Sequence, residues 1–188
     1  MTERLSQKSS VVLIYTGDGK GKTSAAIGLC CRALGAGKKV AFVQFIKNWE
    51  VSEHKFFTGI EPVFRKHFIF YKGGKGFYNL GKHSAKNIST AEHKTAARET
   101  LKFAKACATS GDFDLVICDE INNAVADKLI SRKDLEDLIV SRNARTSLCL
   151  TGRNFPLELL KFVDIATEMT KIKHHYDDGF LAISGIDF

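Results

Sequence analysis

Several features that define common protein classes are missing from this sequence of 188 residues. No apolar run approaches the ~20 residues of a membrane-spanning helix, and the first residues are too polar for a secretory signal. The sequence has no Cys-x-x-Cys pair, no serine nucleophile elbow and no internal repeat. These absences argue against a membrane protein, a serine hydrolase of the elbow type and a solenoid, and we expect a cytoplasmic protein.

The five cysteines are scattered along the chain, and all of them fall in segments that we expect to be helices or strands: Cys30, Cys31, Cys107, Cys118 and Cys149. A disulfide framework or a structural zinc site needs paired cysteines at defined spacings. We therefore expect reduced thiols that pack as small hydrophobic side chains.

The net charge of +7 is concentrated in one part of the chain. Between Lys47 and Lys105 there are twelve Lys or Arg, five Glu and no Asp, so this segment accounts for the whole excess. Such a basic segment can bind nucleic acid or a polyanionic ligand, or it can form a solvated face. For charge runs in general the solvated face is the preferred interpretation.

A loop rich in glycine and lysine at 16–24, Thr-Gly-Asp-Gly-Lys-Gly-Lys-Thr-Ser, is the strongest signal in the sequence. An apolar strand precedes it and a helical segment starts at Lys22, which is the context of a phosphate-binding loop. The backbone amides and the helix N-terminus bind an anion, Lys22 adds a mobile charge, and the Thr23 hydroxyl can ligate Mg²⁺. The predicted nucleotide-binding residues here are Gly17, Asp18, Gly19, Lys20, Gly21, Lys22, Thr23 and Ser24.

One position of this loop departs from the usual pattern. Thr16 stands five residues before Gly21, where glycine is usual. The alternative interpretation is an ordinary glycine-rich turn between a strand and a helix. Turn geometry alone does not account for lysines interleaved with three glycines, so we favour the phosphate loop.

Alternating strand and helix signals predict an α/β protein with a mostly parallel, open sheet, helices on both faces and a RecA-like P-loop NTPase architecture. Residues 1–10 are expected to form a flexible tail and residues 11–188 a single P-loop domain. We expect strands at 11–15, 40–45, 63–71, 115–120, 147–151, 165–172 and 180–186, and helices at 22–34, 89–109, 131–142 and 156–163.

Two strand ends carry further site candidates. Asp119 and Glu120 end an apolar strand, and such carboxylates beside a phosphate loop are suited to bind Mg²⁺ directly or through water. Their alternative role is to cap the following helix. Arg153 and Asn154 follow the strand at 147–151, where Arg153 can hold a phosphate with two hydrogen bonds or remain an ordinary loop arginine.

The neighbouring His174 and His175 invite a metal interpretation, but no second His or Cys cluster stands at ligand spacing. We expect a turn at 173–179. From spacing alone, a phosphate loop with a strand-end Asp-Glu pair predicts a nucleotide and Mg²⁺, and γ-phosphoryl transfer by a kinase or an ATPase is the plain interpretation.

Nearly the whole chain, from about residue 12 to 188, resembles the P-loop type of ATP:corrinoid adenosyltransferases. The residues that carry the resemblance stand in the same order and spacing: Gly17 to Thr23, Val43-Gln44-Phe45-Ile46-Lys47, Gly76-Phe77, Asp119-Glu120-Ile121-Asn122, Leu150-Thr151-Gly152-Arg153-Asn154, Thr167-Glu168-Met169, Lys173-His174 with Asp177 and Gly179, and Gly185-Ile186. The family shares the compact loop seen here, which accounts for Thr16. Many members also carry a basic leader longer than the expected tail of this chain.

The resemblance implies a reaction in which Co(I) of a reduced corrinoid attacks C5′ of ATP and the triphosphate leaves. Lys22 and the loop amides would then stabilise the leaving group. Thr23 and Glu120 would ligate Mg²⁺, with Asp119 behind them. Phe77 would help to remove the lower axial ligand of Co(II), although Tyr78-Asn79 replaces the Thr-Trp of the family motif.

The resemblance also implies a homodimer and a flavodoxin-like or flavin reductant, with no nucleic-acid partner. The basic segment would face the corrinoid phosphate or the acidic reductant. Two rivals remain: a small-molecule P-loop kinase, and a RecA-like ATPase that binds single-stranded nucleic acid. The second would use the basic segment and stacking groups at Phe64, Phe68, Phe77 and Tyr78.

Overall fold

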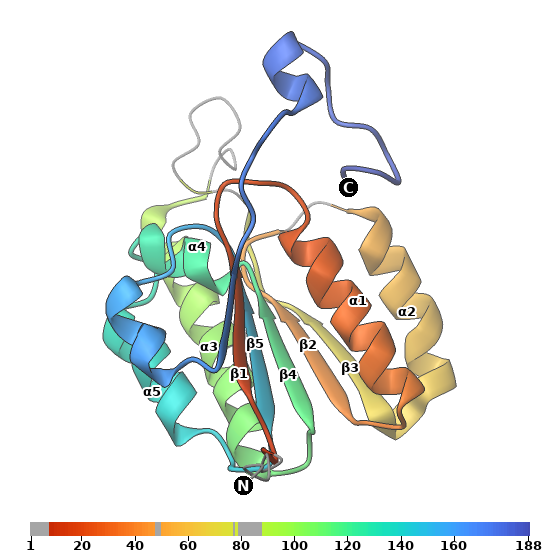
Figure 1. Cartoon of the computed structure of the whole chain (residues 1–188), viewed down its shortest axis with the longest axis vertical. Coiled ribbons are helices and arrows are strands. Elements are labelled where there is room, and N and C mark those ends of the chain that lie inside the picture. Colours follow the sequence, from red (N-terminus) through yellow and green to blue (C-terminus); the bar gives the residue numbers. More distant parts are fainter. Residues whose placement is uncertain (1–7, 48–49, 77, 79–87) are drawn as a thin grey trace, which may run out of the picture.

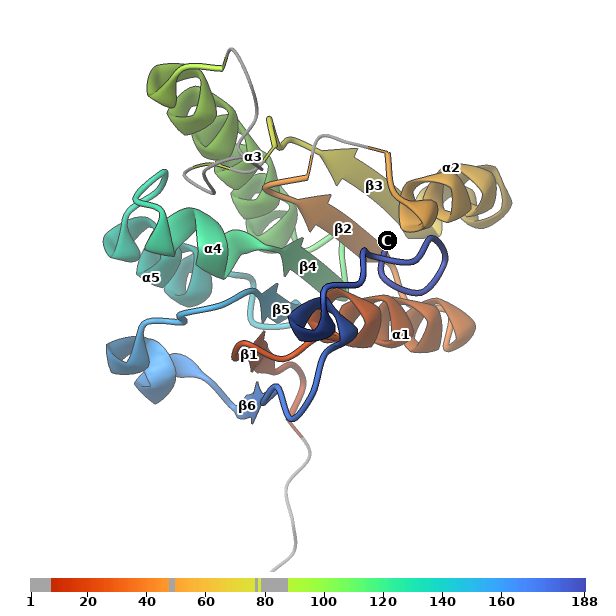
Figure 2. The ribbon, with the colours of Figure 1, turned by 90° about the horizontal axis from the view of Figure 1, so that it is seen from above.

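The computed structural model describes residues 8–47, 50–76, 78 and 88–188. Six strands form one sheet in the order β3-β2-β4-β5-β1-β6, and every neighbouring pair is parallel (Figures 1 and 2). The strands are β1 Val12–Thr16, β2 Val40–Gln44, β3 Phe68–Lys72, β4 Leu115–Asp119, β5 Ser147–Thr151 and β6 Ile165–Glu168. The predicted α/β class and parallel sheet are confirmed.

Helices cover both faces of the sheet, as expected (Figure 2). One face carries α1 Lys22–Gly35 and α2 Ser52–Phe64. The other carries α3 Thr90–Ser110, α4 Ile121–Ala126 and α5 Arg132–Ser141. Successive residues of a strand point to opposite faces, so Leu13 packs with the α1 side and its neighbours Val12 and Ile14 with the α3 side.

Phenylalanine side chains hold α2 against the sheet. Phe57 is fully buried, and its ring centroid lies 4.6 Å from that of Phe42, 5.4 Å from Phe68 and 4.9 Å from Phe70. Such contacts add to the stabilisation from apolar burial. Phe68, which the nucleic-acid alternative needed as a stacking group, is therefore a core residue.

The predicted strand at 63–71 is wrong in its first half. Helix α2 continues to Phe64, a 3₁₀ turn η1 occupies Arg65–His67, and the strand begins at Phe68. The side chains that α2 turns toward the sheet are His54, Phe57, Ile60 and Phe64. Their spacing of three and four residues is the helical period, which the irregular composition of this segment obscured.

The C-terminal part also differs from the prediction. Strand β6 ends at Glu168, and residues 180–186 form no strand. The expected turn is confirmed by the 3₁₀ helix η4 His175–Asp178, and the expected helix at 156–163 is the 3₁₀ helix η3 Leu157–Phe162. Apolar composition alone suggested the last strand, but Phe180, Leu181 and Ile186 are exposed.

Helix ends follow the expected signals. Ser89 accepts a hydrogen bond from the Glu92 amide, and Glu92 accepts from Ser89 in return, which is a capping box. Gly111 ends α3 with φ of +78°. Ser131 and Asp134 form the same box at the start of α5.

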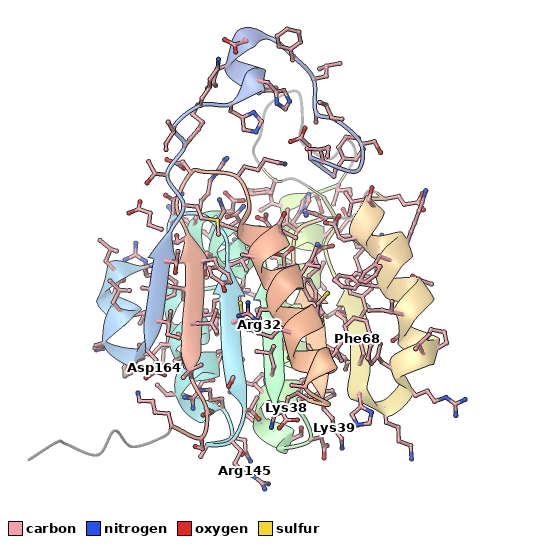
Figure 3. The ribbon with its side chains drawn as sticks, turned by 45° about the vertical axis from the view of Figure 1, so that its right-hand side comes forward. Arg32, Lys38, Lys39, Phe68, Arg145 and Asp164 are labelled. Carbon is pink, nitrogen blue, oxygen red and sulfur yellow. The ribbon has the colours of Figure 1, made fainter. Side chains whose placement is uncertain are left out.

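Of the five cysteines, four are buried as expected, and Cys31 is exposed. Among the described residues, no helix is long and apolar enough to cross a membrane. Lys38, Lys39 and Arg145 lie at the end of the molecule opposite the phosphate loop (Figure 3), so their charges do not face that loop.

Candidate nucleotide site

A cavity of about 610 Å³ lies at the carboxyl ends of the strands, as expected for a parallel sheet. The phosphate loop forms one wall, and the C-terminal segment, residues 169–188, crosses above it (Figure 1). The lining residues include these predicted members of the site: Asp18, Gly19, Lys20, Gly21, Lys22, Thr23, Ser24, Glu120 and Arg153.

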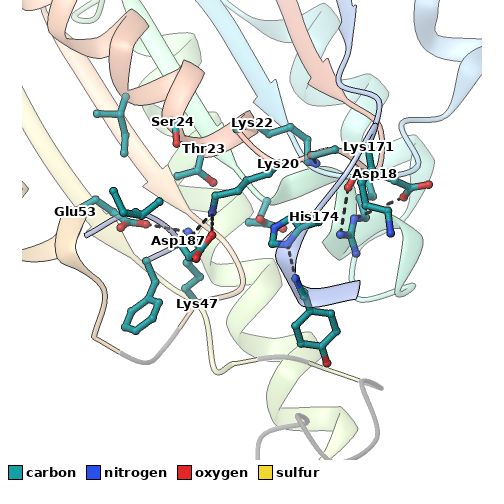
Figure 4. A pocket seen from close by; sticks show the side chains of 18 of the residues that line it. Asp18, Lys20, Lys22, Thr23, Ser24, Lys47, Glu53, Lys171, His174 and Asp187 are labelled. Carbon is teal, nitrogen blue, oxygen red and sulfur yellow. Dashed lines mark hydrogen bonds and ion pairs between the residues drawn. The ribbon is translucent and has the colours of Figure 1, made fainter. Parts of the chain in front are cut away.

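Lys22 lies at the start of α1, and its side chain folds back over the loop (Figure 4). Its Nζ donates hydrogen bonds to the carbonyl oxygens of Gly17, at 2.7 Å, and Gly19, at 2.6 Å. Burial lowers the pKa of Lys22, and Arg153 lowers it further, while Glu120 opposes the shift. The loop thus places one partly desolvated ammonium beside its own backbone.

Two loop glycines are required by a close approach of the chain after β6. A Cβ atom on Gly17 would lie 2.5 Å from the Met169 carbonyl oxygen, and one on Gly19 would lie 2.6 Å from it. The Gly19 amide donates to that oxygen at 2.6 Å, and the Met169 amide donates to the Thr16 carbonyl at 2.9 Å. The loop is therefore braced by Met169.

Thr16 does not need to be glycine, because it is the last residue of β1 and its φ is not positive. Its hydroxyl accepts a long hydrogen bond of 3.4 Å from the Phe155 amide. Thr16, which replaces the usual glycine, is thus a strand residue that also contacts the segment after β5.

Asp119 is fully buried and lies beneath the cavity without lining it. Its Oδ1 accepts hydrogen bonds from the hydroxyls of Thr23, at 3.0 Å, and Thr151, at 2.7 Å. Its Oδ2 accepts from Gln44 Nε2 at 2.9 Å. Three donors fix the carboxylate, so Asp119 is placed to hold Thr23 rather than to face a ligand directly.

A second buried contact extends this network to α2. The Gln44 side chain is fully buried, and its Oε1 lies 2.6 Å from His54 Nε2. Because Gln44 Nε2 donates to Asp119, its Oε1 must accept, so His54 carries a proton on Nε2. Burial lowers the pKa of His54, with Lys72 adding to the effect, which favours the neutral ring.

Glu120 has a left-handed backbone, with φ of 64°. It occupies the N-cap position of α4, but its side chain makes no capping hydrogen bond. Its carboxylate instead accepts from Asn123 Nδ2, and both residues line the cavity. A strained non-glycine residue held in a pocket is a frequent mark of a functional site.

The electrostatics around Glu120 are set by burial and by its neighbours. Burial raises the pKa of Glu120 to about 7, and Asp119 adds to the rise, while Lys47 and Lys22 oppose it. Lys47 Nζ lies 2.8 Å from a Glu53 carboxylate oxygen, and both side chains are largely buried (Figure 4). Burial acts to lower the pKa of Lys47, but Asp119 and Glu53 together raise it.

Arg153 reaches across the pocket to the phosphate loop. Its Nε lies 3.6 Å from an Asp18 carboxylate oxygen, and its amide donates to Asn123 Oδ1 at 2.6 Å. Gly152 precedes it with φ of +124°, and a Cβ there would lie 2.7 Å from the same Asn123 oxygen. This tight turn aims Arg153 at the loop.

Three of the predicted site residues that the structure describes lie outside the cavity lining. Gly17 and Asp119 support it from below. Asn154 lines a separate cavity of about 570 Å³ with Lys94, Arg98 and Pro156, so the structure does not bring it to the phosphate loop. Phe77 lies outside the described residues.

Several cavity residues received no role from the sequence: Ser52, Glu53, Asn123, Lys171, Tyr176 and Asp187. Gln44 gave a usable signal, since it is the one amide in an apolar segment, 40–45, and a buried polar side chain needs partners. No sequence signal marked Glu53 or Asp187, because only the folded chain brings these residues to the cavity.

The oxygen donors fit a hard divalent cation. The Glu120 carboxylate and the Thr23 hydroxyl both line the cavity. The Thr23 hydroxyl donates a hydrogen bond to Asp119, so the lone pairs of the Thr23 oxygen stay free to bind a cation. Carboxylate and hydroxyl oxygens are ligands that Mg²⁺ accepts. The cation would therefore meet Thr23 and Glu120, with Asp119 behind them.

Comparisons with known proteins give a consistent result over almost the whole chain. Residues 8–188 match a family model described as "ATP:corrinoid adenosyltransferase BtuR/CobO/CobP". The chain is 32% identical to the corrinoid adenosyltransferase of Escherichia coli (strain K12), with 95% of this chain and 85% of the relative covered. It is 32% identical to the corrinoid adenosyltransferase of Pseudomonas aeruginosa (strain PAO1), with 95% of this chain and 83% of the relative covered. It is 29% identical to the corrinoid adenosyltransferase CobA of Salmonella typhimurium (strain LT2), with 97% of this chain and 87% of the relative covered.

Proposed function

The chain belongs to the ATP:corrinoid adenosyltransferase family, and from that premise we propose how its pocket serves the reaction. The protein is an enzyme that transfers the adenosyl group of ATP to a corrinoid. In the proposed step, Co(I) of the reduced corrinoid substrate attacks C5′ of ATP and supplies both electrons of the new Co–C bond. The C5′–O bond breaks, and its electron pair leaves with the triphosphate.

The observation that carries this proposal is the convergence of positive groups at the phosphate-loop end of the cavity. The Lys22 ammonium, the Arg153 guanidinium and the N-terminus of α1 all face this end. Groups held in place before the reaction stabilise charge that develops on a leaving group without having to reorganise. The triphosphate gains negative charge as C5′–O breaks, so this end of the cavity suits the leaving group.

We propose Thr23 and Glu120 as the residues that hold Mg²⁺. When bound there, Mg²⁺ supplies positive charge that offsets the charge of the departing triphosphate. Asp119 orients the Thr23 hydroxyl through its hydrogen bond. No side chain has to remove a proton from the nucleophile, because Co(I) attacks with a lone pair, so Glu120 is assigned to the cation and not to base catalysis.

The partners of the reaction are proposals of the same kind. We propose a homodimer and a flavodoxin-like or flavin reductant, with part of the basic segment Lys47–Lys105 facing the corrinoid phosphate or the reductant. Phe77 remains the proposed residue for displacing the lower axial ligand of Co(II). Tyr78 lies beside α3, with its hydroxyl 3.2 Å from Thr90 Oγ1 and its ring centroid 5.3 Å from that of His93.

The direct test is a product assay with purified protein, ATP, Mg²⁺ and cob(I)alamin. We expect stoichiometric release of triphosphate together with a light-sensitive Co–C bond. Release of ADP would support the kinase alternative instead. Salt-sensitive binding to single-stranded DNA without corrinoid binding would support the nucleic-acid alternative. Phe68, one of the stacking residues of that alternative, is buried in the core and cannot contact a base.

A further inference from the structure

We propose that the C-terminal segment, residues 169–188, supplies the wall that binds the adenosine end of ATP. The inference rests on the proposed function, since it assumes that ATP fills the cavity. The same cavity of about 610 Å³ is lined by the phosphate loop on one side and by this segment on the other. A triphosphate at Lys22 leaves the nucleoside to occupy the remainder.

The segment is fastened to the body of the protein at both ends. At its start, the Met169 carbonyl accepts a hydrogen bond from the Gly19 amide. At its end, an Asp187 carboxylate oxygen lies 2.6 Å from Lys20 Nζ (Figure 4), and the Phe188 carbonyl accepts from Ser52 Oγ at 2.8 Å. The segment thus spans the cavity from the phosphate loop to the start of α2.

Asp187 is the main fastening point. Besides Lys20, its carboxylate accepts from the Ile183 amide at 2.7 Å and lies 3.4 Å from His175 Nε2. The hydrogen bond from Lys20 and that from the Ile183 backbone lower the pKa of Asp187 to about 2. The carboxylate therefore stays charged across the working pH range, and the fastening persists with it.

The charges in this half of the cavity are already neutralised. Lys20 is paired with Asp187, Lys171 with Asp177 at 2.8 Å, and Lys47 with Glu53 at 2.8 Å. A polyanion gains little from cations that already have carboxylate partners. This half therefore favours the uncharged nucleoside. In the other half, Lys22 hydrogen-bonds to two uncharged carbonyl oxygens, so its charge stays available to the phosphates.

The side chains that the segment contributes are suited to a flat heterocycle. Tyr176, Ile186 and Phe188 line the cavity from the segment, and Ile27 lines it from α1. Tyr176 is 60% exposed and Ile186 70% exposed, so both have surface available to a ligand. Stacking of a nucleobase on such aromatic and apolar surface is favourable and needs no charge.

The test separates the two halves by using two ligands, ATP and inorganic tripolyphosphate, each with Mg²⁺. Binding is measured by calorimetry on the full chain. Tyr176→Ala and Ile186→Ala should each weaken ATP binding, by about tenfold for the tyrosine, and leave tripolyphosphate binding unchanged. Leu181→Ala is the matched control, because Leu181 lies in the same segment, is 84% exposed and does not line the cavity.

A second variant tests the fastening. Asp187→Asn should weaken ATP binding several-fold, because the segment loses its charged anchor. The same change frees Lys20, so tripolyphosphate binding should stay equal or become tighter.

The inference is overturned if Tyr176→Ala weakens both ligands equally, if it weakens neither, or if it weakens only corrinoid binding. Wild-type protein that bound neither ATP nor tripolyphosphate would instead overturn the proposed function, and this inference with it.

Discussion

At the scale of one residue, Lys22 is the proposed source of positive charge for the leaving triphosphate. Its ammonium is held by the Gly17 and Gly19 carbonyls, and the residue as a whole is only 9% exposed. We predict that Lys22→Ala lowers kcat by about 10²–10³-fold, since one preorganised cation is lost from the triphosphate end. Triphosphate release at saturating ATP measures the effect. Lys38→Ala, which removes an exposed lysine at the opposite end of the molecule (Figure 3), should keep the wild-type rate.

Gln44 gives a second prediction at this scale. Gln44→Leu leaves Asp119 Oδ2 and His54 Nε2 without their shared partner inside the protein. Loss of a buried partner costs about 1–3 kcal/mol of stability, and a less restrained Asp119 should raise the Mg²⁺ concentration needed for half-maximal rate. Urea unfolding and a Mg²⁺ titration measure the two effects. An unchanged Mg²⁺ requirement would restrict Gln44 to a role in folding.

Single residues differ in how well the sequence predicts them. Lys22, Thr23 and Glu120 line the cavity because their motifs have fixed geometry after a strand. Asn154 follows Arg153 directly, yet the positive φ of 56° turns it toward another cavity. Lys47 and Glu53 meet only because α2 starts just after β2, and no local pattern encodes that meeting.

At the scale of elements, the packing of α2 on the sheet is centred on one aromatic side chain, Phe57. Phe57→Ala should lower the free energy of unfolding by about 3–5 kcal/mol, because it empties a fully buried site against Phe42 and Phe68. The neighbouring Phe56 is 47% exposed, so Phe56→Ala is a matched control with an expected effect below about 1 kcal/mol. Urea denaturation at neutral pH compares them. Equal effects would mean that α2 is not held as described.

The two capping boxes predict a pH dependence. Hydrogen bonds from Ser89 lower the pKa of Glu92, and those from Ser131 lower the pKa of Asp134. Both carboxyls have lower pKa values folded than unfolded, so their stabilisation is present above the unfolded pKa and is lost as pH falls through the folded one. Thermal unfolding between pH 6 and about pH 3 should show this loss.

Removing the Ser89 cap isolates the contribution of this capping box to the pH dependence of stability. Ser89→Ala should cost about 1 kcal/mol at pH 6, and much less once Glu92 is protonated. Lys102→Ala, an exposed change on the same helix, should leave the pH profile unaltered. A profile for Ser89→Ala that is parallel to wild type at every pH would contradict the assignment.

Elements were predictable where their signals were local. The caps at Ser89 and Ser131 and the glycine at 111 mark α3 and α5 within one residue. Helix α2 was missed because Gly59 and Pro62, both poor helix formers, lie within it. The order of the strands depends on packing over both faces, and apolar strands carry no mark of their neighbours.

On the scale of the whole molecule, the uneven charge leads to a prediction about the corrinoid. The described part of the basic segment forms α2, η1, β3 and most of α3, which together make up the β3-edge side of the molecule (Figure 2). If this side faces the corrinoid phosphate, raising NaCl from about 0.05 M to about 0.5 M should weaken corrinoid binding several-fold, because salt screens exposed charges. Absorbance titrations with cob(II)alamin measure it. Salt-independent binding would contradict the proposed orientation.

The cavity itself is a property of the whole chain. The phosphate-loop half was predictable from a single motif. The other half comes from residues near the opposite end of the sequence, where Asp187 meets Lys20. An irregular segment with exposed apolar side chains gives no periodic signal, so it was mistaken for a strand.

The position of β1 in the sheet also has a consequence for how the protein is made. β1 carries the phosphate loop and pairs with β5 and β6 alone among the described strands. During synthesis, β1 therefore has no strand partner until residues 147–168 have left the ribosome. Strands β2, β3 and β4 can pair with one another before that point. Such distant parallel pairing is slow. Of all parts of the molecule, the nucleotide site should be the last to form on the ribosome.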